Sequence, residues 1–156
     1  MSEAPDISDA VDGPAHDHHR APVIHAGPQP VAYTLQADLR FADAASYPSE
    51  ELVERLREFL SGLLSALRDG GCTLIGHVKG MVDADDLGRV FFSVTSFRGS
   101  PHVTGAIGGS LGSCRLTLNV IVFGIEEPAI ATAVREAMRL HLAPWQARGK
   151  RLRGAR

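Results

Sequence analysis

Four of the seven histidines lie close together near the start of the chain, and their spacing suits metal chemistry. The segment contains His16, Asp17, His18, His19 and, six residues further on, His25. Imidazole nitrogens and carboxylate oxygens are ligands that borderline divalent ions such as Zn, Co and Ni prefer. We therefore predict a divalent-metal site on these five residues. It should be labile, because ordering a flexible segment around an ion costs binding free energy. The alternative is a polar segment that only happens to be rich in histidine.

A second candidate site lies in the run Gly76-His77-Val78-Lys79-Gly80. Side chains alternate between the two faces of a strand, so His77 and Lys79 would share one face. If no helix covers that face, His77, Lys79 and Gly80 form a surface for a partner or a ligand. The two glycines indicate a bulge or a close approach of another backbone or a ligand. The alternative is the ordinary solvated face of a one-sided sheet.

Motifs of the common catalytic and nucleotide-binding sites are absent from the sequence. It contains no G-x-x-x-x-G-K-[ST] phosphate loop, no H-E-x-x-H, no paired C-x-x-C and no G-x-S-x-G. We predict a non-enzymatic protein that binds no nucleotide. The remaining enzymatic alternative is a site between the glycine-rich loop at residues 108–113 and His77, with His77 or His102 as general base.

Composition and charge divide the 156 residues into three regions. Residues 1–30 carry five acidic residues against one arginine, together with five of the nine prolines. They hold too little apolar surface to offset the entropy of ordering, so we predict a flexible acidic tail. Residues 146–156 carry five basic residues and no acid, which predicts a basic tail. Residues 31–145 remain as a single folded domain.

The pattern between the two tails predicts an α+β fold. Apolar and polar residues alternate over 31–41, as in a strand with one wet face. Leucines recur every three or four residues over 49–69, after a serine and two acids that favour a helix start. Further strands are expected at 72–82, 90–97, 102–107 and 114–123, and a second helix after Glu126. The order predicts a ferredoxin-like sandwich, a mainly antiparallel sheet of four or five strands with two helices on one face. A last edge strand would have to come from residues after Pro144.

This layout resembles the C-terminal domain of CobW-type GTP-binding metallochaperones over roughly residues 16–142. A stretch rich in histidine and aspartate leads into a strand, a helix that begins Pro-Ser-Glu-Glu-Leu at residues 48–52, and the strand 74–80. Lys79-Gly80 matches a lysine-glycine pair of that family, and His77 stands where an arginine is common. The GTPase domain of the family, with its phosphate loop and metal motif, is missing. The resemblance implies an accessory domain that holds a metal loosely, dimerises or recognises a client protein, and whose partner could be a separate GTPase.

The remaining composition indicates a cytoplasmic protein with reduced thiols. Cys72 and Cys114 are too few for a disulfide scaffold, and the first residues are acidic where a secretory signal would be basic. No apolar run approaches the ~20 residues of a membrane span. The basic end has no interleaved aromatic residue, so nucleic-acid binding is not expected.

We also expect a homo-oligomer, because an open sheet face or strand edge tends to find a partner. The side chains that would form this contact are the expected outward apolar residues Ile75, Met81, Phe91 and Phe97.

Overall fold

The computed structural model of the chain describes residues 27–41, 47–142 and 145–151. In chain order the elements are β1 (Pro30–Phe41), β2 (Tyr47–Pro48), α1 (Ser49–Asp69), β3 (Leu74–Asp83), the 3-10 turn η1 (Asp85–Leu87), β4 (Gly88–Val94), β5 (His102–Ile107), β6 (Ser110–Leu111), β7 (Ser113–Phe123), α2 (Glu127–His141) and β8 (Trp145–Arg151). The histidine-bearing segment, with His16, Asp17, His18, His19 and His25, lies outside the described residues. Neither described helix combines the length and the apolar composition of a membrane-crossing helix.

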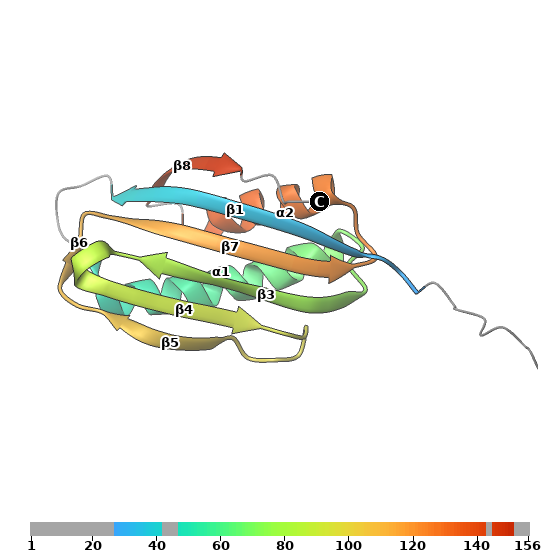
Figure 1. Cartoon of the computed structure of the whole chain (residues 1–156), viewed down its shortest axis with the longest axis horizontal. Coiled ribbons are helices and arrows are strands. Elements are labelled where there is room, and N and C mark those ends of the chain that lie inside the picture. The colour runs from blue at the N-terminus through green and yellow to red at the C-terminus, as the bar shows by residue number, and fades with distance from the viewer. Residues whose placement is uncertain (1–26, 42–46, 143–144, 152–156) are drawn as a thin grey trace, which may run out of the picture.

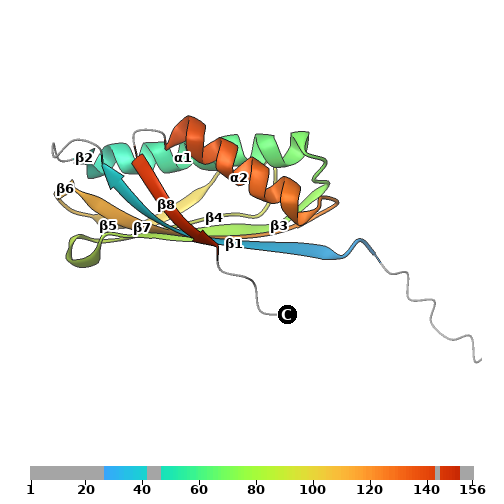
Figure 2. The same cartoon turned by 90° about the horizontal axis from the view of Figure 1, so that it is seen from above.

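The strands form a six-stranded sheet in the order β5–β4–β3–β7–β1–β8, in which all neighbours are antiparallel. Both helices pack on the same face of this sheet, as the two views in Figure 1 and Figure 2 show. Without the inserted hairpin β4–β5, the spatial order β8–β1–β7–β3 is that of a split βαβ, ferredoxin-like fold. The predicted fold class is therefore confirmed, and the sheet has one strand more than the largest number expected.

The additional strand is β8, which pairs with β1 so that Phe41 lies opposite Trp145 and Leu35 opposite Arg151. The predicted boundary between domain and basic tail, at residues 145 and 146, falls inside this strand. Trp145, Ala147 and Gly149 alternate with polar residues, but Trp145 is the one large apolar residue of the segment, and its basic residues favoured a tail over a strand. The expected last edge strand does come from residues after Pro144. Pairing with β1 explains its place, because an unpaired strand edge leaves a row of backbone N–H and C=O groups without partners.

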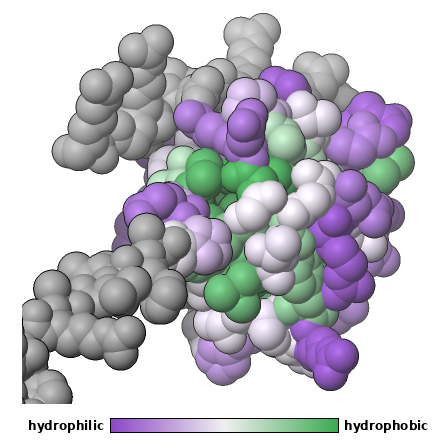
Figure 3. Space-filling view, turned by 90° about the vertical axis from the view of Figure 1, so that its right-hand side faces the viewer, coloured by the Kyte–Doolittle hydropathy of each residue, from purple (hydrophilic) through white to green (hydrophobic). Residues whose placement is uncertain are grey.

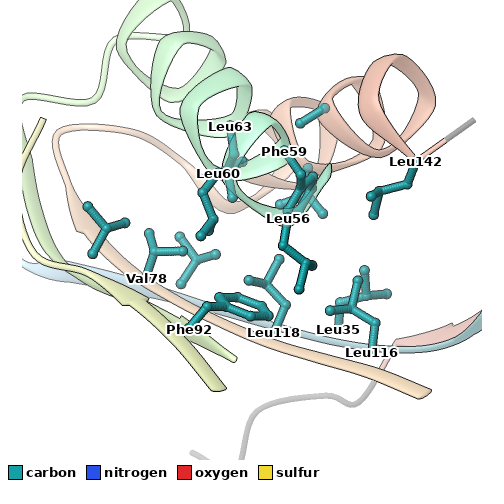
Figure 4. Close-up of a cluster of buried hydrophobic side chains, with 14 of the residues drawn as sticks. Leu35, Leu56, Phe59, Leu60, Leu63, Val78, Phe92, Leu116, Leu118 and Leu142 are labelled. Atoms are coloured by element: carbon teal, nitrogen blue, oxygen red, sulfur yellow. The ribbon is translucent and has the colours of Figure 1, made fainter. Parts of the chain in front are cut away.

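The core lies between the helices and the inner face of the sheet. Helix α1 is long and amphipathic, and the leucine stripe expected from the sequence is its buried side, together with Phe59. Figure 4 shows these helix side chains directed at Val78, Phe92, Leu116 and Leu118 on the strands. Among the described residues, no polar or charged side chain is buried. The described side chains on the inner face therefore only pack, and the polar side chains of the sheet lie on the other face.

Candidate functional site

The helices leave the opposite face of the sheet uncovered by any described element (Figure 2). We call it the outer face. Its side chains come from alternate positions of each strand, and the strand register aligns them in rows across the sheet. One row runs from Asn119 through Lys79 and Ser93 to His102. The next runs from Thr117 through Met81 and Phe91 to Thr104.

A groove of about 340 Å³ lies on the outer face over these two rows. Its lining residues are Lys79, Gly80, Met81, Phe91, Phe92, Ser93, His102, Thr104, Thr117 and Asn119. Met81 and Phe91 are direct cross-strand neighbours, and they make the centre of the groove apolar. Phe91 is 50% exposed, which is unusual for a large aromatic side chain in a strand and marks a surface able to bury more apolar area.

Polar groups border this apolar centre on the side of Lys79. Thr34 Oγ1 donates a hydrogen bond to Asn119 Oδ1 at 2.9 Å, which orients the Asn119 amide beside the groove. Lys79 is exposed, and no described carboxylate lies within ion-pair distance of its ammonium group. The groove thus offers a free cation and hydrogen-bonding side chains next to an apolar floor.

The opposite border of the groove carries alternating charges whose order across the sheet is Asp38, Arg115, Asp83 and Arg89. Arg115 Nε donates to Asp38 Oδ1 at 3.1 Å, and Arg89 Nε lies 3.0 Å from Asp83 Oδ2. The hydrogen bond from Arg89 is the main reason that the pKa of Asp83 lies below its ordinary value. Exposed pairs of this kind contribute little stability. Their effect is that the arginines of this border already have carboxylate partners, whereas Lys79 has none among the described residues.

Two of the three residues predicted for this surface, Lys79 and Gly80, line the groove. His77 lies on the outer face two residues from Lys79, opposite Ile121, and is not among the lining residues. Gly80 alternates with outward Lys79 and Met81, so a Cβ there would point toward the core and collide with the Thr117 carbonyl oxygen and the ring of buried Phe92. The bulge or close approach expected from the glycines is confirmed: the β3–β7 register shifts between Ile75 and His77, and Gly80 makes the close approach.

Of the four apolar residues expected to point outward, two lie in the groove and two are buried or partly buried. Met81 and Phe91 do lie in the groove. Ile75 is buried at 3% exposure, because the bulge at Gly76 reverses which strand positions face the helices. Phe97 is partly buried beneath the guanidinium of Arg68, whose Cζ lies 4.6 Å from the ring centroid.

The enzymatic alternative required His77 to lie near the loop at residues 108–113, and the structure separates them. Ser113, at the end of the loop, begins β7, whereas Ile121, opposite His77, lies eight residues further along the same strand. At ~3.4 Å per residue the two are ~27 Å apart. Part of the loop also forms β6, whose Leu111 is buried. Among the described residues no cluster of three or more His, Cys, Asp or Glu side chains could hold a metal ion.

Apolar side chains are also exposed at the end of the molecule where β1 begins. Figure 3 views this end and shows apolar residues at its centre with hydrophilic ones around them. Leu74, the first residue of β3 and 55% exposed, lies at this end opposite Phe123. We take the groove as the candidate site because it joins exposed apolar area to a free cation and oriented polar groups.

No protein-family model, no curated protein and no solved structure matches the chain. The resemblance to the CobW C-terminal domain therefore stays a prediction, and the function has to be argued from the surface itself.

Proposed function

We propose that the protein is a non-enzymatic binding module that docks a partner protein on its outer face. The observation that carries this proposal is the groove, with half-exposed Phe91 at its apolar centre and, at its border, Lys79, which has no carboxylate partner among the described residues. Aromatic side chains at the centre of a contact with polar groups around them are the usual anatomy of a protein interface. The free thiols of Cys72 and Cys114 suit a reducing compartment, and we place the module in the cytoplasm.

The sheet edges support a contact through the face instead of through strand addition. At one edge, β5 contains Gly105 with φ of +88°, a backbone conformation outside the range of a regular strand. At the other edge, β8 contains Arg148, Lys150 and Arg151. Irregular and basic edge strands are two ways in which proteins avoid pairing with further strands.

Site-specific photocrosslinking tests the docking surface. Phe91 is replaced by benzoylphenylalanine in the full chain, and the matched control carries the same group at Leu140, which is 55% exposed on α2. We expect one adduct of defined mass at position 91 and no such adduct at position 140. The yield of the adduct at position 91 should fall at least tenfold with Met81→Asp in the groove. Equal labelling at both positions would contradict the proposal.

The same experiment distinguishes the alternative, a homo-oligomer that uses this face for a second copy. Its adduct at position 91 would have twice the mass of the chain. Light scattering of the unmodified protein would then show a mass that rises with concentration, and a monomer at all concentrations removes this alternative.

We further propose that the segment with His16, Asp17, His18, His19 and His25 supplies a labile site for Zn, Co or Ni. The chemistry of the donor set supports this, since imidazole and carboxylate suit these ions. In calorimetric titrations of the tag-free chain with zinc chloride, replacing the four histidines with alanine should abolish binding. His102→Ala, a change on the outer face, serves as the matched control and should leave the affinity unchanged. Binding that survives the fourfold replacement would show that the segment is not the site.

A further inference from the structure

The groove has a charge preference that follows from its position on the outer face. From the groove toward the end where β1 begins, the outward strand positions include Lys79, His77 and His102 but no carboxylate. Toward the opposite end, Asp38 and Asp83 pair with arginines. An occupant that places an apolar side chain between Met81 and Phe91 and a carboxylate near Lys79 would complement both features of the groove.

The chain itself contains a segment of this chemistry. Residues 6–12 read Asp-Ile-Ser-Asp-Ala-Val-Asp, with two β-branched apolar side chains among three carboxylates and no basic residue. The segment lies outside the described residues, and it is joined to the sheet through residues 13–29. The tether ends at Pro30, where β1 begins, four residues before Thr34, which the strand register aligns with Lys79.

The tether is long enough to reach the groove. Gln36 of β1 is aligned through Thr117 with Met81, so Pro30 lies six residues from the groove along the strand, about 20 Å. The groove centre lies about two and a half strand spacings from β1, or about 12 Å, which gives a total of about 24 Å. Eighteen residues join position 12 to position 30, and a chain of that length reaches at most about 59–65 Å when fully extended, so the segment can reach the groove.

We propose that residues 6–12 dock in the groove of the same molecule, with Ile7 or Val11 between Met81 and Phe91 and a carboxylate at Lys79. This inference rests on the proposed use of the groove as a docking surface and adds its regulation, because a partner would have to displace the segment. A tether that can reach the groove makes docking intramolecular and so raises the effective concentration of the segment there. Even a weak contact is then populated in the absence of a partner, and a partner would bind correspondingly less tightly.

Paramagnetic broadening in the full chain tests this docking. A nitroxide label is attached at Ala10→Cys, and the methionine methyl groups are observed by NMR. The two native thiols are buried and stay unlabelled in the folded protein. Met81 reports on the groove, and Met138 on α2, on the helix side of the sheet, is the internal control.

We expect the Met81 methyl signal to lose at least half its intensity and the Met138 signal to change several-fold less. The matched variant carries the same label with Asp6, Asp9 and Asp12 replaced by asparagine, and most of the Met81 broadening should disappear. Broadening of Met81 that is no greater than that of Met138, or that is unchanged in the asparagine variant, overturns the proposal. If the Met81 signal is not broadened but the partner adduct at position 91 still forms, only the docked segment is refuted. Loss of that adduct with Met81 still broadened would refute only the partner-binding function.

Discussion

Two adjacent phenylalanines of β4 test most sharply whether one face of the sheet is buried and the other exposed. Phe92 is 2% exposed in the core, whereas Phe91 is 50% exposed in the groove. Replacing a fully buried phenylalanine with alanine costs about 3–5 kcal/mol, because the transfer free energy of the ring and the cavity that it leaves both oppose folding. For Phe91 we expect a cost of about 1 kcal/mol, roughly half the transfer free energy of a buried side chain and no cavity.

Urea unfolding followed by far-UV circular dichroism measures the difference. With an m-value of about 2 kcal/mol/M, the midpoint should fall by about 1.5–2.5 M for Phe92→Ala and by about 0.5 M for Phe91→Ala. A total stability of about 5–15 kcal/mol leaves the larger loss measurable. Equal midpoint shifts for the two variants would refute the reasoning, because they would mean that both faces of β4 are equally buried in solution.

Three further predictions concern single positions. Gly80→Ala should lower the free energy of unfolding by about 1–3 kcal/mol, because the added methyl group overpacks the core. The control is Gly112→Ala, where nothing lies within 4 Å of a Cβ. Its free energy of unfolding in the same urea assay should stay within about 0.5 kcal/mol of the parent. The hydrogen bond from Arg89 lowers the pKa of Asp83 below the ordinary 3.8, so its stabilising effect is present above that value and lost as pH falls through the lower folded-state pKa. The stability difference between the parent and Asp83→Asn should therefore be constant from pH 7 to about 5 and vanish in stronger acid, and a difference that persists in stronger acid would contradict this origin. Burial raises the pKa of Cys114 to about 12, so its thiol should react with iodoacetamide only as fast as the protein unfolds, and rapid labelling of the native state would disprove its burial.

The candidate site was only partly predictable from local pattern. The pair His77 and Lys79 was placed on one face by simple alternation, and the structure agrees. The same alternation predicted that Ile75 faces outward, which was wrong, because the bulge at Gly76 turns the residues before it to the opposite face. The glycine itself was the available signal, but the position of a bulge depends on how β3 pairs with β7, which lies some forty residues further along the chain.

The groove residues Thr117, Asn119 and Thr104 had no individual signal in the sequence. Each is an ordinary polar residue of a strand with one wet face. They become part of one surface only because antiparallel pairing aligns β7, β3, β4 and β5 in register. The charged border of the groove arises in the same way, since Asp38 and Arg115 are 77 residues apart in sequence.

The elements with periodic, local signals were predictable from the residues alone. Alternation over β1 and β7 and the leucine stripe of α1 were enough to predict an α+β sandwich with one uncovered face. The pairing of distant segments places residues 145–151 at the edge of the sheet, turns Ile75 inward, and leaves Lys79 without a described carboxylate beside Met81 and Phe91. The physical reason is that strand pairing, register and bulges depend on contacts between distant segments, which no local pattern of residues encodes.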